Sequence, residues 1–440
     1  MAILEKIEAD FKKALRERDS QALSVLRMLK AALQNEGIAK KRESLTEADG
    51  LRILRRELKQ RQESSEEWKK AGRDLEIEKE QAAIAIIEGY LPRQIGEEEV
   101  KKIVKELNNI IQLAKVGKFK ILQEEEDCHT AIENYLTKKL GDLGKKIHTG
   151  RSRNDQVLTA LRLCYKDDLE NCMKLIRDFI EAMREFVKKY GKIKLPGYTH
   201  TRKAMPSSIA LWGDSFIESM EDNLTLINFV FKLVNQSPLG TGVGYELPIK
   251  VDRRYVSKLL GFKKIQKNPI YTQNSRGKFE STILHSLSQV MFDLNKMAND
   301  LITFTIPELG YFEIPPEFCT GSSIMPQKQN PDVLELLRAK YYTILSYESQ
   351  IKTLIGNLLS GYNRDLQLTK EPTMRALEIT KKSLSIAKLI IENLKVNEEK
   401  CKKGLTEEIY ATERVYKLVE KGVPFRKAYQ KISKKYVKGK

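Results

Sequence analysis

The chain has 440 residues, 31% of them charged and 41% hydrophobic, which excludes a disordered or membrane-embedded protein and leaves room for two to four domains of about 100–200 residues each. Its net charge of +18 is unevenly distributed: residues 1–110 carry 23 Lys and Arg against 22 Asp and Glu, so residues 111–440 carry a net charge of +17. This excess of positive charge suggests anionic partners, either small acids or nucleic acid. The charged N-terminus shows no secretory signal, and no apolar run reaches the ~18–20 residues of a membrane span. The five cysteines include no C-x-x-C pair, which argues against a disulfide scaffold or a structural zinc site. Together these features predict a reduced, cytoplasmic location.

Helical periodicity begins at the N-terminus. Ser44, followed three residues later by Glu47, is a capping-box pattern that predicts the start of a helix running to about Lys70. The predicted helices of this part cover residues 1–18 and 20–36, a segment from the cap at Ser44 to about Lys70, a segment ending before Pro92, and about 97–115.

After residue 155 the predicted helices become much longer, and apolar residues recur along them at helical spacing. Several reach about thirty residues, against a usual length of ~10–14, and helices of that length normally pack as bundles that are often shared between subunits. We therefore predict an all-α fold. The long helices are expected over residues 157–190, 207–235, 280–305 and 332–360.

Three polar stretches interrupt this pattern and are expected at helix ends rather than on helix faces. They are HTGRSRNDQV (148–157), GYTHTRKAMP (197–206) and GSSIMPQKQNPD (321–332). A glycine-rich stretch, PLGTGVGYE (238–246), lacks the context of a phosphate-binding loop and is interpreted as a turn between long helices.

The last of the three polar stretches offers the parts of a serine base. A serine hydroxyl becomes basic only where backbone N–H groups and a nearby cation stabilise its oxyanion, and the Gly321-led loop with Lys328 supplies both kinds of group. The alternative is a loop that caps the next helix through Asn330.

The other two polar stretches suit an anionic substrate. Arg151 and Arg153 precede a helix, and both a guanidinium fork and a helix N-terminus bind carboxylates well, although a capped helix start with solvated arginines explains the pattern equally. Thr199 stands beside His200, which is either an acid–base group or a structural histidine. The four histidines, His129, His148, His200 and His285, show no metal-ligand spacing, so we expect no metal.

Together the three stretches resemble the fumarase/aspartase superfamily, and the fold they imply is its long-helix bundle. GSSIMPQKQNPD is similar to the superfamily's signature loop, and HTGRSRNDQV with EDCHTAIE (126–133) narrows the resemblance to the argininosuccinate lyases. The similarity runs from about Glu106 to about Tyr436. It continues through PLGTGVGYELPI, SGYNRDLQLTKEP (360–372) and KGVPFRKAY (421–429).

The resemblance implies β-elimination of argininosuccinate to arginine and fumarate without a cofactor, in a homotetramer whose active sites each combine three subunits. It implies that Ser322 is the base, that Lys328 and Asn330 stabilise the dianionic intermediate, and that His200, held by Glu335, has an acid–base or orienting role. The implied substrate-binding and pocket-lining residues are His129, Thr130, Ser152, Arg153, Asn154, Thr199, Tyr362, Gln367 and Lys370. The histidine stretch departs from the family pattern GYTHLQ-x-AQP at Thr201, Arg202 and Met205, changes expected to affect packing only.

The front of the chain departs from the lyase pattern. Residues 1–105 instead resemble part of the small helical YqeY-like family, related to the tail of a tRNA-dependent amidotransferase subunit, through the stretches 22–42, 57–73 and 88–104. The seam, near residues 104–109, lies inside one continuous predicted helix. The predicted domains are a small helical domain (1–105), the remainder of a lyase N-terminal region (106–155), the long-helix bundle (156–362) and a C-terminal helical domain (363–440).

Two alternatives stay open at this point. One is another fumarate-releasing lyase, such as one acting on adenylosuccinate, against which HTGRSRNDQV argues. The other is a catalytically impaired helical protein whose YqeY-like domain has a tRNA-related role. The near-neutral charge of residues 1–110 argues against strong phosphate binding there, so nucleic acid is not an expected partner.

Overall fold

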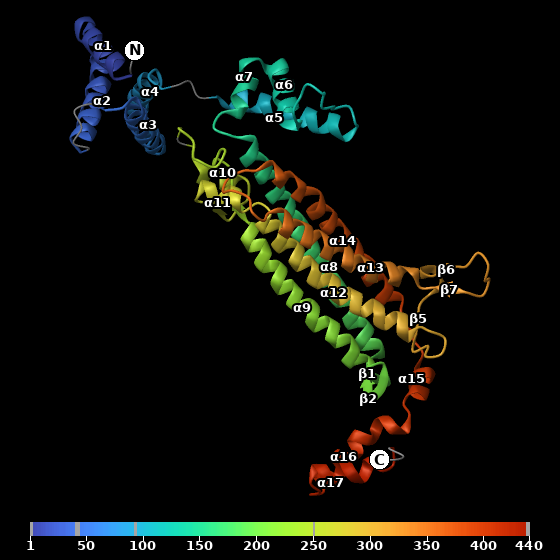
Figure 1. The fold of residues 1–440 in the computed structure, drawn as a ribbon. Helices are drawn as coiled ribbons and strands as arrows, with labels where there is room; N and C mark the ends of the chain where they lie inside the picture. Colours follow the sequence, from blue (N-terminus) through green and yellow to red (C-terminus); the bar gives the residue numbers. More distant parts are fainter. Residues whose placement is uncertain (1–2, 40–44, 92–94, 250, 437–440) are drawn as a thin grey trace. The chain divides into compact units, whose positions relative to one another are not determined.

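A computed structural model describes residues 3–39, 45–91, 95–249 and 251–436 of the chain. The chain divides into two compact units, residues 1–147 and 148–440, and each has its own set of helices (Figure 1). This division does not test the four domain ranges predicted above, which stay a prediction. Within the described residues, no helix is both long and apolar enough to cross a membrane.

The first unit begins with four helices that enclose their own apolar core. Leu26, Leu29 and Leu33 lie on one face of the second helix and are buried, as their three- and four-residue spacing predicts. Ile53, Leu54 and Ile87 from the third and fourth helices complete this core. The helices are α1 (Ile3–Glu17), α2 (Ser20–Ala39), α3 (Glu47–Lys70) and α4 (Asp74–Glu88).

The capping box predicted for α3 was assigned to the wrong residues. Thr46 is the N-cap, its side chain accepts the N–H of Asp49, and the Asp49 carboxylate accepts the N–H of Thr46 in return. Ser44 lies outside the described residues. The pattern was misread because the sequence offers two candidates two residues apart: Ser44 with Glu47, and Thr46 with Asp49.

The rest of the first unit is also helical. One continuous helix, α5, covers the predicted seam at residues 104–109, and the Tyr135 hydroxyl of α6 donates to the Glu106 carboxylate of α5 at 3.3 Å. Gly141 separates α6 from the next short helix. The elements are α5 (Glu97–Lys115), α6 (Cys128–Leu140), α7 (Asp142–Lys145) and the 3-10 turn η1 (Lys146–His148).

The second unit is a bundle of long helices, as the periodicity predicts. The predicted helix over 332–360 is shorter than expected: it ends at Leu354, because Asn357 adopts a left-handed conformation (φ 61°) just after Gly356. The long helices are α8 (Arg153–Tyr190), α9 (Ile209–Val234), α12 (Lys278–Phe304), α13 (Asp332–Leu354) and α14 (Lys370–Asn393).

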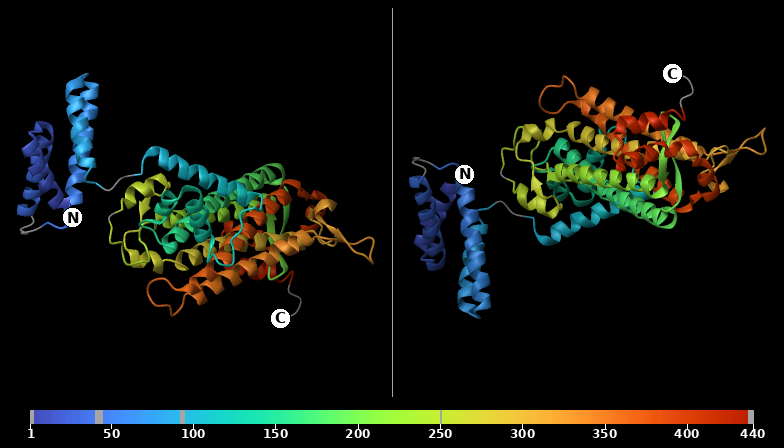
Figure 2. Two further views of the ribbon diagram at one scale, coloured as in Figure 1. Left: turned by 90° about the horizontal axis from the view of Figure 1, so that it is seen from above. Right: turned by 90° about the horizontal axis from the view of Figure 1, so that it is seen from below.

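Helix α12 provides the centre of the bundle and packs against α9, α13 and α14, while α8 packs against α9 and α14 (Figures 1 and 2). Apolar residues recur along nearly its whole length and are fully buried, from Ile283 and Leu284 to Met297 and Leu301. Gly277 before it has φ 72°, and a Cβ there would collide with Ile355 at the end of α13. Close packing at this corner therefore requires glycine.

The remaining elements are short connections at the ends of the bundle. Four two-stranded sheets occur among the described residues, pairing β1 with β2, β3 with β4, β5 with β8 and β6 with β7. The strands are β1 (Lys194–Thr199), β2 (Arg202–Ser208), β3 (Gln236–Ser237), β4 (Lys264–Ile265), β5 (Phe312–Glu313), β6 (Thr320–Gly321), β7 (Gln329–Asn330) and β8 (Lys395–Val396). The short helices are α10 (Arg253–Leu259), α11 (Pro269–Asn274), η2 (Pro316–Phe318), η3 (Arg364–Thr369), α15 (Glu398–Gly404), η4 (Glu407–Tyr410), α16 (Ala411–Glu420) and α17 (Phe425–Ser433).

The bundle has two distinct ends, which we name the Asn154 end and the His200 end. At the first, the N-terminus of α8 lies beside that of α12, because Arg276 donates to the Asn154 carbonyl oxygen. At the second, the Tyr198 hydroxyl of β1 and the Tyr311 hydroxyl that follows α12 are 2.8 Å apart. Helix α8 has 38 residues, so at about 1.5 Å per residue these two ends lie about 57 Å apart.

Candidate active site

The N-terminus of α8 carries three of the predicted substrate-binding residues. Ser152 is the N-cap and accepts the N–H of Asn154, so the prediction of a polar stretch at a helix start is confirmed for residues 148–157. Ser152, Arg153 and Asn154 are all partly exposed at this helix end. A helix N-terminus flanked by an arginine favours a carboxylate ligand.

Asp155 holds the start of α8 in place. This residue is not among those predicted from the sequence. Its fully buried carboxylate accepts the backbone N–H groups of Ser152 at 2.9 Å, Gly240 at 2.9 Å and Gly242 at 2.8 Å. Burial raises the pKa of the Asp155 carboxyl, against the opposing effect of these N–H groups. The stretch interpreted as a plain turn, residues 238–246, is therefore also a support for the α8 N-terminus. The available signal was the S-x-x-D pattern of Ser152 and Asp155.

The segment after α13 reaches the same end of the bundle. The Tyr362 hydroxyl accepts a hydrogen bond from the Gln367 side chain, and the Arg276 guanidinium lies 5.1 Å from the centre of the Tyr362 ring. Because Arg276 also donates to the Asn154 carbonyl, the structure brings Asn154, Tyr362 and Gln367 to one place. Lys370 begins α14, which runs alongside α8 and is joined to it by the ion pair of Lys381 and Asp168.

Thr199 and His200 lie at the opposite end, in a hairpin rather than the expected loop at a helix end. Thr199 ends β1 and pairs with Arg202, and His200 and Thr201 form the turn, both with left-handed backbones, with φ of 52° and 59°. Such a turn matches the twist of the two strands but is uncommon for residues other than glycine, asparagine and aspartate. Both Thr199 and His200 are exposed.

The signature loop, residues 321–332, belongs to the half of the bundle nearer His200. Helix α13 follows it and runs back along α12: Arg338 donates to Asn299 in the last part of α12, whereas Ile355 reaches Gly277 before its start. Strands β6 and β7 form the base of the loop, which projects from the bundle (Figure 1).

Inside this loop, the Ser322 side chain forms a local turn with the backbone that follows it. Its Oγ accepts the backbone N–H groups of Ile324 at 3.3 Å and Met325 at 3.1 Å. The alternative role of Asn330 as a helix cap is wrong, because Asn330 pairs in β7 and the N-cap is Pro331 without a side-chain hydrogen bond. Lys328 is exposed and Asn330 partly so.

His200 and Glu335, predicted to act as a pair, are not joined within one chain. Glu335 is exposed in the first turn of α13, and no hydrogen bond or ion pair links it to His200 among the described residues. His129 and Thr130 lie in the first unit, where their backbone N–H groups donate to the Asp127 side chain at the start of α6.

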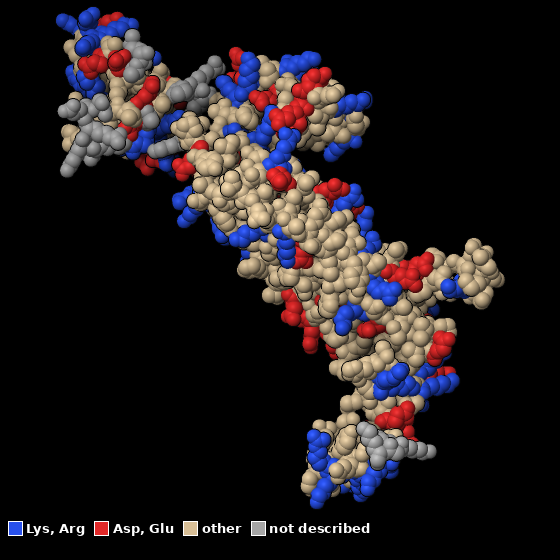
Figure 3. Space-filling view, viewed as in Figure 1, with Lys and Arg blue, Asp and Glu red and all other residues tan. Residues whose placement is uncertain are grey.

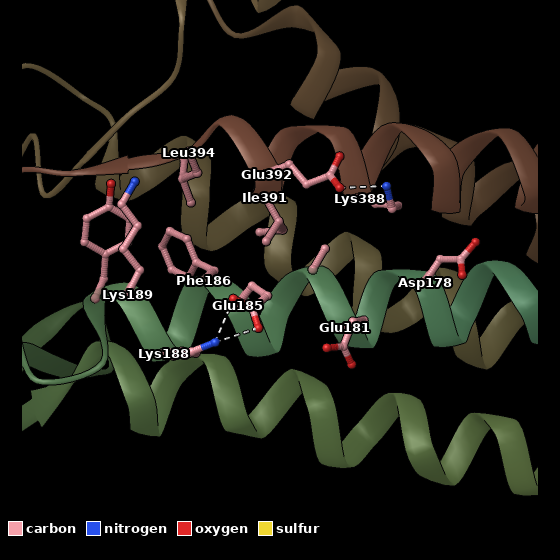
Figure 4. Close-up of a pocket in the computed structure, with 12 residues that line it drawn as sticks. Asp178, Glu181, Glu185, Phe186, Lys188, Lys189, Lys388, Ile391, Glu392 and Leu394 are labelled. Atoms are coloured by element: carbon pink, nitrogen blue, oxygen red, sulfur yellow. Dashed lines mark hydrogen bonds and ion pairs between the residues drawn. The ribbon is translucent and has the colours of Figure 1, made fainter.

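One groove of the second unit lies away from the predicted site residues. It holds about 630 Å³ between α8 and α14; Phe186 of α8 and Ile391 and Leu394 of α14 lie between the two helices, and charged side chains such as Glu181 and Lys189 also line it (Figure 4). None of the predicted site residues lines it. Over the residues that the structure describes, no three His, Cys, Asp or Glu side chains are grouped in a way that could hold a metal ion.

Comparison with known proteins identifies the family to which the chain is similar. The model of a family described as "Lyase" matches residues 16–345. The argininosuccinate lyase of Thermotoga neapolitana is 50% identical over 366 residues, which are 82% of this chain and 92% of that protein; the argininosuccinate lyase of Sorangium cellulosum is 39% identical over 339 residues, which are 77% and 79%.

Solved structures share the fold at lower identity. An EDDS lyase in complex with formate aligns with a TM-score of 0.67 at 22% identity, over 76% of this chain and 66% of that one. A fumarate lyase from Mesorhizobium sp. BNC1 aligns with a TM-score of 0.63 at 16% identity, over 78% of both chains. These likenesses confirm the predicted all-α, long-helix bundle fold.

Proposed function

Because this chain belongs to the lyase family and, within it, to the argininosuccinate lyases, we infer that it splits argininosuccinate by β-elimination into L-arginine and fumarate, a step of arginine biosynthesis. The observation that carries this function is 50% identity across 92% of the length of the Thermotoga neapolitana argininosuccinate lyase. The residue roles below are our proposals.

Ser322 is the proposed base. It removes a proton from the substrate carbon next to a carboxylate, and the electron pair of the C–H bond moves into that carboxylate. The two N–H groups that its oxygen accepts, from Ile324 and Met325, support this role because they lower the cost of the alkoxide that must form first. Lys328 and Asn330 then stabilise the dianionic intermediate.

Breaking the C–N bond completes the reaction. The electron pair held in the carboxylate returns to form the C=C bond of fumarate, while the electron pair of the C–N bond leaves on the guanidino nitrogen, which takes up a proton. His200, held by Glu335 of another copy of the chain, has an acid–base or orienting role in this step.

The substrate is held by the α8 N-terminus and its neighbours. Arg153 and the helix N-terminus suit the carboxylates, and the polar groups of Ser152 and Asn154 lie beside them. The further proposed contacts are His129, Thr130, Thr199, Tyr362, Gln367 and Lys370.

We propose a homotetramer in which several chains build each site. The two ends of α8 lie about 57 Å apart, so one chain cannot bring Asn154 and His200 onto one substrate. The bundle also shows a broad surface with few charges over α9, α12 and α13 (Figure 3). Large apolar side chains are exposed on these helices: Leu211, Phe229, Phe292, Leu336 and Tyr342.

A cytoplasmic location is proposed from the cysteines. All five are free, two of them buried and two exposed, which fits a reducing compartment.

The test is an assay of the purified full chain with argininosuccinate, following fumarate by its ultraviolet absorbance. Argininosuccinate should release fumarate, and adenylosuccinate, assayed alongside, should release none. Fumarate from adenylosuccinate alone would assign the protein to the other lyase. No fumarate from either substrate by an intact oligomer would contradict the activity.

A further inference from the structure

A buried arginine that none of the motifs includes lies behind the proposed substrate residues. Arg276 stands between α11 and α12 and is only 4% exposed. Burying a guanidinium costs considerable free energy unless it is paired and hydrogen-bonded, so its surroundings show what it holds in place.

The contacts of Arg276 reach two separate substrate segments. Its Nη2 donates to the carbonyl oxygen of Asn154, and its Nε donates to the side-chain oxygen of Gln273 at 3.1 Å. Its guanidinium faces the ring of Tyr362 at 5.1 Å, within the range of a cation–π interaction. One planar cation thus joins the first turn of α8 to the loop that follows α13.

A buried counter-charge, Glu280, attracts the arginine. Glu280 is 2% exposed, accepts the N–H of Gly277 at 2.7 Å, and attracts the charges of Arg276 and Arg162. Burial lowers the pKa of Arg276 and raises that of Glu280, and in each case the opposite charge works against burial.

Neighbouring contacts hold the same loop. Asn274 accepts the N–H of Gly361 at 2.7 Å and donates to the Ser360 hydroxyl at 3.1 Å. The ring of Tyr362 therefore has little freedom to move away from the arginine, and its hydroxyl stays bonded to Gln367.

We propose that Arg276 is a positioning residue for substrate binding. It fixes the positions of Asn154 and Tyr362 relative to each other, because it donates a hydrogen bond to the Asn154 carbonyl and stacks on the Tyr362 ring. This inference rests on the proposed function, because it needs both residues to contact argininosuccinate. Arg276 acts through these two residues, so its loss should weaken substrate binding more than it slows the chemical step.

Arg162 provides a matched control. It is 1% exposed, donates to the Gln236 carbonyl at 2.7 Å and the Ser275 hydroxyl at 2.8 Å, and lies 4.9 Å from the ring centre of Phe279. It shares the counter-charge Glu280 with Arg276, but Gln236, Ser275 and Phe279, which it contacts, are not proposed substrate residues.

The experiment compares Arg276→Gln, Arg276→Lys and Arg162→Gln in the full-length oligomer, measuring thermal stability, kcat and KM with argininosuccinate. Both Gln variants should lose stability. Arg276→Gln should raise KM about 10- to 100-fold, the effect of losing a charged hydrogen bond, with a smaller change in kcat, whereas Arg162→Gln should leave KM within about twofold.

Arg276→Lys keeps the positive charge, but a lysine ammonium cannot bond both Asn154 and Gln273 while it stacks on Tyr362. The KM of this variant for argininosuccinate should therefore rise at least about threefold. If Arg276→Gln does not fold, this variant decides the question. An unchanged KM in a folded Arg276 variant, or an equal rise in Arg162→Gln, would overturn the proposal. A wild-type protein without argininosuccinate activity would overturn the proposed function, and this inference with it.

Discussion

Ser322 and Ser323 carry the same hydroxyl group but have different surroundings. Two backbone N–H groups, those of Ile324 and Met325, donate to Ser322 Oγ, whereas no backbone N–H of the described residues donates to Ser323 Oγ. An alkoxide formed at Ser322 is therefore stabilised at once, whereas one formed at Ser323 is not. The local fold of the loop thus favours one of two adjacent serines as the base.

Replacing Ser322 with alanine should reduce kcat by about 10²- to 10⁴-fold, because the general base is lost. The melting temperature should change little, because the residue lies in a projecting loop. Steady-state fumarate release and a thermal melt measure the two effects. Ser323→Ala is the control and should retain most of the activity; if it lost as much as Ser322→Ala, the N–H groups would not explain the choice of base.

At the scale of elements, polar side chains help to pair the long helices. Glu348 of α13 is 6% exposed; it is 3.2 Å from His285 Nδ1 of α12, and it accepts from Lys352 one turn further along α13 at 2.5 Å. Burial acts to raise the pKa of Glu348, but the bonds from Lys352 and Ser288 and the charge of Lys352 lower it below its usual value of 4.5.

This lowered pKa gives the packing of α12 and α13 a pH dependence. Since the folded pKa lies below the unfolded one, ionised Glu348 stabilises the fold above about pH 4.5, and the contribution disappears as the pH falls through the folded pKa. Glu348→Gln should thus cost about 1 kcal/mol at pH 7, because Lys352 is half exposed and screened. Denaturant unfolding of the variant and wild type, from neutral pH to about pH 3, measures the difference.

A surface pair with the same spacing serves as the control. Glu378 and Lys382 of α14 are also four residues apart, but the Glu378 side chain is 60% exposed. Glu378→Gln should change stability little at any pH, since exposed ion pairs contribute little. A stability deficit of Glu348→Gln that stays constant across the pH range would show that the lost charge is not its cause.

At the scale of the whole molecule, the proposed site is distributed along the bundle. Ser152, Asn154, Tyr362 and Gln367 lie at the Asn154 end; Thr199 and His200 lie at the His200 end; and the signature loop with Ser322 lies in the half nearer His200. The length of α8, about 57 Å, greatly exceeds the length of an argininosuccinate molecule. The proposed site therefore needs different copies of the chain that place opposite ends side by side.

Shared sites predict that two inactive variants restore each other. Asn154→Ala and Ser322→Ala, each inactive alone, should recover activity when co-expressed, because some sites receive Asn154 from one chain and Ser322 from another. With random mixing, about a quarter of the sites should be intact. The specific activity of the mixed oligomer, purified through two different tags, measures this fraction.

The control for this experiment combines Ser322→Ala with Lys328→Ala. Both changes lie in one loop, so no site can draw an intact loop from such a pair, and activity should stay absent. Recovery in this control, or none with Asn154→Ala, would contradict sites shared between chains.

The sequence by itself determined the family, the predominance of helix and the position of most long helices. Helical spacing of apolar residues, as in Leu26, Leu29 and Leu33, depends on neighbours within a few turns, so it can be read along the chain. Caps such as Ser152 are equally local, although adjacent candidates caused the error at Ser44 and Thr46.

Only the tertiary structure decided which polar segments meet. The carboxylate of Asp155 accepts N–H groups more than eighty residues away, and Arg276 reaches Asn154 from 122 residues along the chain. These contacts depend on how α8, α12 and α14 lie against one another, and no periodicity encodes that arrangement. The same packing separates Asn154 from His200, because a single rigid helix, α8, spans the distance between the two ends.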